Sequence, residues 1–556
     1  MFEGLNIEMD FENFPPYINP NRPWLNYWPE NVPKSIKYDP ITFHDFVRYL
    51  SDIYPVNVAI YYVPEEKKYT YRELFFYADR IANALIDKFG VKKGDSVAIM
   101  SGNVPEFIFI ILGISQTGAS IIPVNPLLKD SEVEHIINEA GNVKCLFVHD
   151  KNFRVIKKVK RSVKIDHTII FRNKEPKKDT INFEDFIQGA SSKPPQIDID
   201  PMNDIATLLF TGGTTGLPKG VMLSHDNLIS DALGVIYLNI DTYEEWAGKE
   251  AMISVLPLCH TFGFEVLIVA LAGGSMMILE GDFVPERIMQ HIELFKVKNF
   301  TGVPLMYQLI ISHPSFGKYD LSSITSSISG SAALPSEIAK KWEKGTDNIK
   351  VAQGYGLTEA SPVTHMQTGW LPEIRPDSVG IPLLKTDAAI VNPETLDELP
   401  IGDVGELLIK GPQVMKGYWK HPEATERVIV KDGWLRTGDL ARMSEDGYFY
   451  IEGRTKDMIK YKGYKVMPRE VEDKLETHPA ISQAGVIGIP DPESGENIRA
   501  FVVLEKEYEG KITEQEIIDW AKENIASYKY PRFVTIVGGI PRTIIGKIDR
   551  KALKKK

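Results

Sequence analysis

A ten-residue stretch, TGGTTGLPKG at 211–220, concentrates the residue types that bind anions. Its glycines expose backbone N–H groups, Thr211, Thr214 and Thr215 add hydroxyls, and Lys219 adds a positive charge. Such groups together cradle the oxygens of a polyphosphate. A dinucleotide loop has G-x-G-x-x-G opening directly into a helix, and a Walker loop has G-x-x-x-x-G-K before Ser or Thr. Neither pattern is present, and a glycine-rich surface turn remains the alternative.

Two further segments place small and polar residues at the ends of expected strands. SISGSAALPSE (327–337) is typical of a strand end, a small-residue loop and a helix that Pro335 begins. QGYGLTEAS (353–361) follows the expected strand IKVA in the same way. Because ligands bind beyond the carboxyl ends of strands in α/β sheets, both segments are candidates for a binding site. The small residues of the first could equally permit close helix packing.

Helix and strand patterns alternate through the first half of the chain, which predicts an α/β fold with parallel sheets flanked by helices. Thr70 and Glu73 form a capping box and Gly90 occupies a C-terminal cap, so a helix is expected between them. IATLLF (205–210) and GVMLSH (220–225) are expected strands on either side of the glycine-rich stretch. The other expected strands in this half are SVAIM, SIIPV, VKCLFVHD and HTIIF, and further expected helices are PEFIFIILGISQ and DNLISDALGVIYL.

The sequence pattern changes from about residue 375, where short expected strands separated by tight turns begin. Asp446-Gly447 is a hairpin signal, and a small β-barrel is expected over about 375–453. We expect 1–455 to form an N-terminal body and 456–556 to form a separate C-terminal domain.

The composition, with 43% hydrophobic and 25% charged residues, is that of a globular enzyme. The net charge of 64 − 75 = −11 argues against a nucleic-acid binder, which needs a basic face. No uninterrupted apolar stretch reaches the roughly 20 residues of a membrane span, and the acidic N-terminus is unlike a signal peptide. With only two cysteines, Cys145 and Cys259, a reducing cytoplasm is the expected location.

The glycine-rich stretch resembles the phosphate-binding loop of the adenylate-forming superfamily, which includes acyl-CoA synthetases, aryl-CoA ligases, peptide-synthetase adenylation domains and firefly-type luciferases. From about residue 40 onward the chain carries segments similar to the family's motifs, in the family's order: PLCHTFGF, SISGSAALPSE, QGYGLTEAS, GWLRTGDL, GRTKDMIKYKGYKV and PRTIIGKIDRKAL. The resemblance implies a body of two doubly wound α/β subdomains plus a small β-barrel, followed by a mobile C-terminal α+β domain.

The resemblance also implies an ATP site. The residues that would hold the β- and γ-phosphates are Thr211, Gly212, Gly213, Thr214, Thr215, Gly216 and Lys219. Those that would surround the adenine are Gly330, Ser331, Ala332, Gly354, Tyr355, Gly356, Leu357 and Thr358. Glu359 would hold Mg²⁺ against the triphosphate, because magnesium binds oxygen and usually shares its site with phosphate. Asp439 and Arg454 would bind the ribose hydroxyls, with a surface ion pair as the alternative.

The remaining implied roles concern catalysis, the acyl group and coenzyme A. The catalytic residues would be Lys547, His260, Thr358 and Glu359, and the acyl pocket would be lined by His260, Phe262, Gly330 and Gly356. The coenzyme A site would include Lys460, Lys462, Gly463 and Tyr464, and the hinge between the two domains would lie at Lys456.

The reaction implied is the ATP-dependent ligation of a small-molecule carboxylic acid to coenzyme A. The acid attacks the α-phosphate to give acyl-AMP and pyrophosphate, and the thiol then displaces AMP. Both first reactants are anions, so catalysis rests on charge neutralisation and alignment, with Lys547 bridging the carboxylate and α-phosphate oxygens. The C-terminal domain would swing about Lys456 between the steps.

The acid is less closely specified. Acetyl-specific relatives carry a tryptophan where this chain has Gly356, which favours an open pocket floor and a medium-chain or longer fatty acid. No acidic residue stands out as a partner for an amino group, which disfavours an amino acid. An aryl-CoA ligase and a stand-alone adenylation enzyme that loads a carrier protein are the alternatives. A luciferase-type oxygenase and a non-catalytic nucleotide-binding regulator are disfavoured. The oligomeric state stays open, with a homodimer as one candidate.

Overall fold

The computed structural model describes residues 6–211, 217–238, 248–462, 464–542 and 547–555. The chain forms two compact units. The first comprises Met1–Pro376, Gly380–Asp387 and Lys410–Leu435, and the second comprises Asp377–Val379, Ala388–Ile409 and Arg436–Lys556. Within the described residues, no helix is long and apolar enough to cross a membrane.

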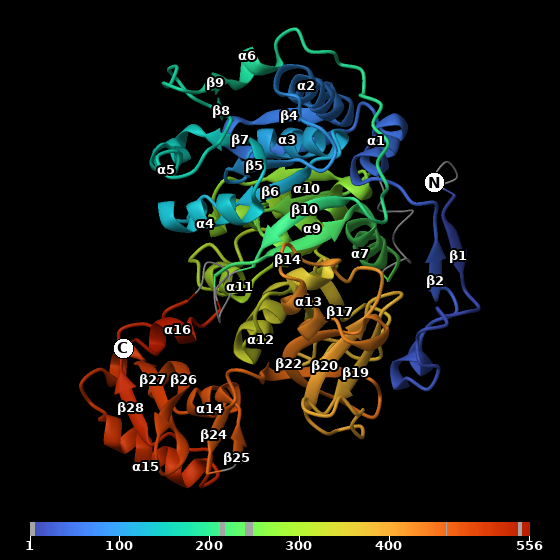
Figure 1. Cartoon of the computed structure of the whole chain (residues 1–556). Helices are drawn as coiled ribbons and strands as arrows, with labels where there is room; N and C mark the ends of the chain where they lie inside the picture. Colours follow the sequence, from blue (N-terminus) through green and yellow to red (C-terminus); the bar gives the residue numbers. More distant parts are fainter. Residues whose placement is uncertain (1–5, 212–216, 239–247, 463, 543–546, 556) are drawn as a thin grey trace. The chain divides into compact units, whose positions relative to one another are not determined.

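An eight-stranded sheet in the first unit carries the glycine-rich stretch (Figure 1). Its order is β21-β11-β10-β6-β5-β7-β8-β9, and the run from β10 to β9 is parallel. Only β11 and β21 are antiparallel to their neighbours. The strands are β5 (Ser96–Met100), β6 (Ser120–Val124), β7 (Val143–His149), β8 (His167–Phe171), β9 (Ile181–Asn182), β10 (Ile205–Phe210), β11 (Gly220–Ser224) and β21 (Gly417–Tyr418).

A nine-stranded sheet in the same unit has the order β18-β17-β16-β15-β14-β12-β13-β3-β4. Its six central strands, β16 to β3, are parallel. The strands are β3 (Val58–Tyr62), β4 (Lys67–Thr70), β12 (Ala251–Ser254), β13 (Met276–Leu279), β14 (Asn299–Gly302), β15 (Ser326–Ser329), β16 (Val351–Gly356), β17 (Val363–Met366) and β18 (Ile381–Pro382). A separate short pair, β1 (Glu8–Asp10) and β2 (Ser35–Lys37), lies near the N-terminus.

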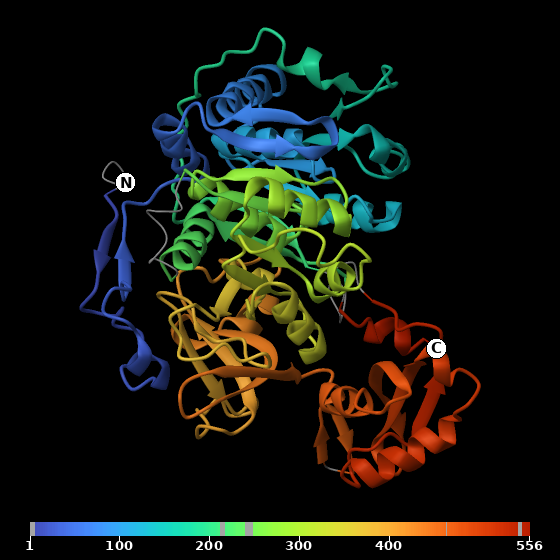
Figure 2. The ribbon, with the colours of Figure 1, turned by 180° about the vertical axis from the view of Figure 1, so that it is seen from behind.

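Helices cover both faces of the two sheets, which confirms the expected doubly wound architecture. They are α1 (Phe43–Ile53), α2 (Tyr71–Phe89), α3 (Pro105–Gln116), α4 (Asp130–Ala140), α5 (Phe153–Val159), α6 (Phe183–Ile187), α7 (His225–Leu238), α9 (Thr261–Ala272), α10 (Pro285–Phe295), α11 (Pro304–Ile311), α12 (Ser336–Gly345) and α13 (Pro422–Val428). Helix α3 packs on β5 and β6, and α9 packs on β12 and β13. Helices α10, α11 and α12 cover the second sheet's other side, which faces the reader in Figure 2.

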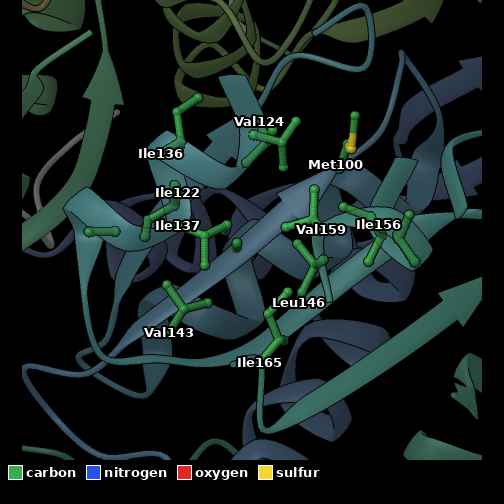
Figure 3. Close-up of a cluster of buried hydrophobic side chains, with 14 of the residues drawn as sticks. Met100, Ile122, Val124, Ile136, Ile137, Val143, Leu146, Ile156, Val159 and Ile165 are labelled. Atoms are coloured by element: carbon green, nitrogen blue, oxygen red, sulfur yellow. The ribbon is translucent and has the colours of Figure 1, made fainter. Parts of the chain in front are cut away.

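The core of the first sheet shows why the sequence alternation produces this layering. Alternate residues of β5, Ala98 and Met100, join Ile136 and Ile137 of α4 and Ile156 of α5 in one buried cluster (Figure 3). Successive side chains of a strand point to opposite faces, so the intervening residues of β5 face the other side, where α3 packs. A strand that is buried on both faces must be apolar at every position, as SVAIM nearly is.

Helix α2 begins and ends as its sequence predicts. The Thr70 side chain accepts a hydrogen bond from the backbone N–H of Glu73, and the Glu73 carboxylate accepts one from the Thr70 backbone N–H at 2.7 Å. Gly90 caps the other end at φ 63°, a left-handed conformation that glycine adopts without strain.

Removing this cap gives a local stability prediction. Thr70→Ala should weaken the first turn of α2 by about 1 kcal/mol, the usual contribution of an N-cap side chain. Hydrogen exchange of the first-turn amides should therefore become roughly fivefold faster. Thr513→Ala is the matched control, because Thr513 and Glu516 form the same capping box at the start of α15 (Glu514–Asn524). If either variant accelerated hydrogen exchange equally in the first turns of α2 and α15, the assignment of these two threonines as local caps would be wrong.

The second unit contains two sheets. A four-stranded sheet has the order β19-β20-β22-β23, and a five-stranded sheet has the order β25-β24-β27-β26, with β28 paired to β27. The elements are β19 (Asp387–Val391), β20 (Gly405–Lys410), β22 (Leu435–Met443), β23 (Phe449–Arg454), β24 (Ile459–Tyr461), β25 (Tyr464–Val466), α14 (Pro468–Leu475), β26 (Ile481–Asp491), β27 (Gly495–Leu504), α15, β28 (Phe533–Ile536) and α16 (Arg550–Leu553). Apolar residues of β26, β27, α14 and α15 form the core beside the five-stranded sheet.

This division differs from the domain boundary expected from the sequence. Much of the segment 388–454 groups with the C-terminal residues, so the boundary between 455 and 456, and the hinge at Lys456, stay predictions. The segment expected to be a β-barrel forms the β19-β20-β22-β23 sheet, with the expected hairpin at Asp446-Gly447 between β22 and β23. Among the described strands of this sheet, β19 and β23 form no pair that would close it into a barrel.

Candidate functional site

The glycine-rich stretch connects two antiparallel strands. Phe210 at the end of β10 pairs with Gly220 at the start of β11, and the Thr211 N–H donates to the Lys219 carbonyl at 3.2 Å. The loop therefore stands at the carboxyl end of β10, as the sequence predicts. Five of its predicted phosphate-binding residues lie outside the described residues: Gly212, Gly213, Thr214, Thr215 and Gly216.

Lys219 and Glu359 both contact one tyrosine, Tyr418. The Lys219 ammonium stands 5.6 Å from the centre of the Tyr418 ring, within range of a cation–π contact. The Tyr418 hydroxyl donates a hydrogen bond of 2.8 Å to Oε1 of Glu359. The structure thus brings together a cation from the glycine-rich loop and a carboxylate from the QGYGLTEAS segment, which are 140 residues apart in the sequence (359 − 219).

Strand β21 explains this convergence. It adds to the edge of the first sheet, where Val221 of β11 pairs with Tyr418. The N–H of Met415 donates to the Glu359 carbonyl at 2.9 Å, and the N–H of Lys416 donates to the Met222 carbonyl at 2.9 Å. Residues 415–418 therefore hold the Glu359 segment against the first sheet. Sequence analysis did not single out Tyr418, because only this non-local pairing places it at the site.

The segment from Gly354 to Glu359 is half-buried and begins on β16. The Tyr355 ring lies edge-on to His365, with centroids 5.9 Å apart and planes at 62°. Thr358 forms a hydroxyl–hydroxyl hydrogen bond of 2.9 Å with Thr261, at the start of α9. Thr261 is a second residue that sequence analysis missed, although it lies inside the quoted motif PLCHTFGF.

Gly356 lies where the backbone is closely packed, and the open pocket floor expected at this position stays a prediction. A Cβ atom at this position would lie 2.0 Å from the carbonyl oxygen of Pro362. The backbone turns back here, since the Leu357 N–H donates to that same carbonyl at 2.9 Å. Glycine is therefore favoured here by the close backbone approach, and any larger residue would have to move the Pro362 backbone.

The small-residue loop after β15 is adjacent to the β16 segment, because the two strands are parallel neighbours. Gln353 on β16 accepts a hydrogen bond of 2.8 Å from the N–H of Leu334, which fixes the loop. Ser331 and Ala332 are half-buried, and Ser331 has a positive φ of 68°. A Cβ atom on Gly330 would lie 3.0 Å from the ring of Phe262. The loop and the start of α9 are therefore in close contact.

His260 is the N-cap residue of α9. Its Nδ1 accepts a hydrogen bond of 3.3 Å from the N–H of Phe262, and the His260 N–H donates to the Pro257 carbonyl at 2.9 Å. The imidazole is half-buried. The structure thus gathers four of the predicted acyl-pocket and catalytic residues, His260, Phe262, Gly330 and Thr358, around the N-terminus of α9.

In the second unit, Asp439 and Arg454 are paired. They are register partners on β22 and β23, and the Arg454 Nε lies 3.0 Å from Oδ1 of Asp439. The Asp439 side chain is 7% exposed and that of Arg454 40%, so one end of the pair is buried while the other remains accessible. The ion pair that the sequence left as an alternative exists, and a carboxylate oriented by a guanidinium also suits a vicinal diol.

The other predicted residues of this unit have distinct settings. Lys456 is exposed in the turn after β23, and Lys460 is exposed on β24. Lys462 has a positive φ of 48°, and its N–H donates to the Ser494 carbonyl at 2.8 Å. Tyr464 is exposed and stacks on Tyr528, with ring centroids 4.6 Å apart. Lys547 is half-buried, and Gly463 lies outside the described residues.

Two further buried carboxyl groups, Asp231 on α7 and Glu265 on α9, were not singled out from the sequence. Burial raises the pKa of Asp231 on α7 well above its ordinary value, although the Val363 N–H and the Glu265 side chain act against this. Burial and the neighbouring Asp231 raise the pKa of Glu265 on α9 in the same direction. Asp231 follows the glycine-rich stretch in an ordinary helical pattern, so no local signal marked it. Within the described chain, no three His, Cys, Asp or Glu side chains group as metal ligands.

Two family models match the chain. The model described as AMP-binding enzyme covers residues 51–419, and the model described as AMP-binding enzyme C-terminal domain covers residues 470–547. These ranges include the glycine-rich stretch, the Tyr418–Glu359 contact and Lys547.

Similar proteins cover nearly the whole chain. A long-chain-fatty-acid–CoA ligase of Bacillus subtilis is 36% identical over 96% of this chain and 97% of its own length. A probable 4-coumarate–CoA ligase of Dictyostelium discoideum is 34% identical over 86% of this chain and 89% of its own. Among solved structures, ATP-bound MatB from Rhodopseudomonas palustris is 30% identical with a TM-score of 0.83, over 93% of this chain and 99% of that one.

Proposed function

The chain belongs to the AMP-binding enzyme family, and from this premise we propose that it is an ATP-dependent acyl-CoA ligase. A carboxylate oxygen of the acid attacks the α-phosphorus of ATP, and the bond to the bridging oxygen breaks to release pyrophosphate. The coenzyme A thiol then loses its proton and attacks the acyl-adenylate carbonyl, and AMP leaves. The names of its relatives support a fatty acid of medium or longer chain, with an aryl acid as the second candidate.

The contact of Lys219, Tyr418 and Glu359 carries this proposal. It places one positive charge and one carboxylate beside the base of the glycine-rich loop, where Lys219 precedes β11 and Thr211 follows β10. A polyphosphate needs cations and N–H donors, and its metal ion needs a carboxylate. We propose that Thr211, Lys219 and the loop residues between them bind the β- and γ-phosphates of ATP, which leave as pyrophosphate.

The donor set fits Mg²⁺. Oε1 of Glu359 accepts from Tyr418, and Oε2 has no hydrogen bond to a residue that the structure describes. Magnesium takes oxygen ligands and commonly binds through one or two carboxylates, several waters and substrate phosphates, so a dedicated cage of protein ligands is not required. When bound, the ion would neutralise phosphate charge. Glu359 would hold it, while Tyr418 would orient the carboxylate.

The other roles follow the settings of the residues. The adenine would lie between the loop Gly330–Ala332 and the Gly354–Thr358 segment, and Asp439, oriented by Arg454, would accept hydrogen bonds from the ribose hydroxyls. His260 and Phe262 would lie beside the acyl group. We assign Lys547 to the α-phosphate and carboxylate oxygens during the first step, and Lys456 to the hinge. The exposed Lys460, Lys462 and Tyr464, together with Gly463, would meet coenzyme A in the second step.

A panel of carboxylic acids of graded chain length tests the activity. Each acid is incubated with ATP and Mg²⁺, with and without coenzyme A, and AMP and thioester are measured. The proposal expects acid-dependent pyrophosphate release and a thioester that forms only with coenzyme A. Adenylate formation followed by no turnover with coenzyme A, but turnover with an acyl carrier protein, would instead establish the carrier-loading alternative.

Removing the Tyr418 hydroxyl gives a further prediction. Tyr418→Phe keeps the ring beside Lys219 but removes the hydrogen bond to Glu359, so the carboxylate loses its orientation. We expect kcat/KM for Mg·ATP to fall by about 10–100-fold, as for other groups that orient a metal-binding residue. Tyr450→Phe is a control, because Tyr450 contacts Arg442 in the second unit. An unchanged kcat/KM in Tyr418→Phe would show that the Tyr418 hydroxyl does not orient the Glu359 carboxylate for catalysis.

A further inference from the structure

Helix α4 contacts both of the segments that carry Lys219 and Tyr418. Its buried apolar residues belong to the core of the first sheet. His135 and Glu139 are four positions apart, so they share one face of the helix. His135 reaches the residues just before β11, and Glu139 reaches those just after β21, at separations of 83 and 282 positions in the sequence.

His135 holds the residue that precedes Lys219. Its Nε2 lies 2.8 Å from the carbonyl oxygen of Pro218. Because a carbonyl oxygen only accepts, Nε2 carries the proton and donates this hydrogen bond. The imidazole is half-buried, so water competes less for the bond than it would at an exposed position. The carbonyl belongs to the planar peptide group that joins Pro218 to Lys219. Fixing its direction therefore fixes the backbone from which the Lys219 side chain extends.

The backbone that follows is held by the sheet. The Lys219 carbonyl accepts a hydrogen bond of 3.2 Å from the N–H of Thr211, and the Gly220 carbonyl accepts one of 2.8 Å from the N–H of Trp419. These bonds accompany the pairing of β11 with β10 and β21. The Lys219 side chain thus extends from a backbone that is fixed by the sheet on one side and by His135 on the other.

The same helix holds the segment after Tyr418. Nε1 of Trp419 donates a hydrogen bond of 3.1 Å to the carbonyl of the last residue of α4. Nζ of Lys420 donates one of 2.8 Å to the Glu139 carbonyl, and Nε2 of His421 lies 2.8 Å from Oε1 of Glu139. Three consecutive residues after Tyr418 are thereby attached to the end of α4.

These contacts meet at the ring of Tyr418, whose centre is 5.6 Å from the Lys219 ammonium. We propose that α4 positions Lys219 and Tyr418 for the β- and γ-phosphates of ATP. His135 is a positioning residue for the lysine, and Glu139 is a positioning residue for the tyrosine. This inference rests on the proposed ligase function and adds two residues to it. Both residues act through others, since the phosphates are assigned to the glycine-rich loop.

Two substitutions at His135 separate its hydrogen bond from its packing. His135→Phe keeps a ring of similar size but has no donor, whereas His135→Gln keeps an N–H donor. Because a misplacement of about 1 Å can cost about 10²-fold in rate, kcat/KM for Mg·ATP in adenylate formation should fall about tenfold or more in His135→Phe. His135→Gln should recover most of this loss. Thioester formation from added acyl-AMP should not change, because AMP lacks the β- and γ-phosphates.

Calorimetric binding of Mg·ATP and of AMP tests the same role without turnover. In His135→Phe the Kd for Mg·ATP should rise about tenfold, while the Kd for AMP stays constant. His149→Ala is the matched control, because His149 is a half-buried histidine of the same unit that accepts a hydrogen bond of 3.0 Å from the N–H of Lys151 in its own turn. It should change neither Kd. Equal losses for ATP and AMP, or equal effects of His135→Phe and His135→Gln, would overturn the inference.

Glu139→Ala tests the second contact. It removes the bond to His421 and keeps the backbone carbonyl that Lys420 contacts. The Kd for Mg·ATP should rise about threefold, as for the loss of one hydrogen bond, with AMP binding unchanged. If His135→Phe does not fold, an unchanged Kd for Mg·ATP in Glu139→Ala refutes the inference. Absence of acid-dependent pyrophosphate release by the unaltered protein would refute the ligase proposal itself. Normal release, with unchanged Mg·ATP binding in both variants, would refute only the role of α4.

Discussion

The Lys547→Ala protein should form almost no acyl-adenylate from ATP and acid, while it converts added acyl-AMP and coenzyme A to thioester at nearly the normal rate. The first step joins two anions, and Lys547 is the group that we assign to the oxygens between which charge builds up. Loss of one such electrostatic contact costs at least about 10²–10³-fold in rate. The second step expels AMP from an activated acyl group and does not need this lysine.

Separate assays of the two half-reactions measure this effect. Acid-dependent pyrophosphate release reports the first, and thioester formation from synthetic acyl-AMP reports the second. Lys551→Ala is the control, because Lys551 is an exposed lysine on α16, four residues further on. If both half-reactions fell by the same factor in Lys547→Ala, the lysine would have a structural role and the assignment would be wrong.

Glu359→Gln should reduce kcat/KM for Mg·ATP by about 10²-fold or more. The substitution keeps the size of the side chain and an oxygen that accepts from Tyr418, but it removes the negative charge. An amide oxygen is a weaker ligand for a hard divalent cation than a carboxylate is. The Mg²⁺ concentration needed for half-maximal activity should rise, and the loss should be partly recovered at high Mg²⁺.

A magnesium titration of pyrophosphate release measures both effects. The control is Glu523→Gln, which removes one carboxylate from the exposed surface of α15 and should leave the titration unchanged. If the Glu359→Gln protein had a lower kcat but an unaltered magnesium dependence, the carboxylate would support the local structure of the protein and would not hold the metal ion.

The order of helices and strands in the body could be predicted from the sequence because local signals agree there with the tertiary fold. The capping box of Thr70 and Glu73, the cap at Gly90 and the strands on either side of the glycine-rich stretch are all set by residues within a few positions of one another. The position of Glu359 beyond β16 followed from the rule that ligands bind at the carboxyl ends of parallel strands.

Contacts between distant segments could not be predicted in this way. Tyr418 reaches Glu359 only because β21 joins the edge of the first sheet, and Asp231 meets Glu265 only because α7 packs against α9. The packing around Gly356 could not be predicted for a different reason. A glycine in a sequence is compatible both with free space and with a close backbone, and only the structure shows that a Cβ atom here would lie 2.0 Å from the Pro362 carbonyl oxygen.

The central claim is that this chain activates a carboxylic acid by transferring AMP to it. The most direct measurement follows an ¹⁸O label from the acid's carboxylate through one complete reaction with ATP, Mg²⁺ and coenzyme A. Attack on the α-phosphorus predicts one labelled oxygen in the AMP product and unlabelled pyrophosphate, together with the acyl-CoA thioester. Label in inorganic phosphate with ADP as the nucleotide product, or AMP without label, would contradict the account.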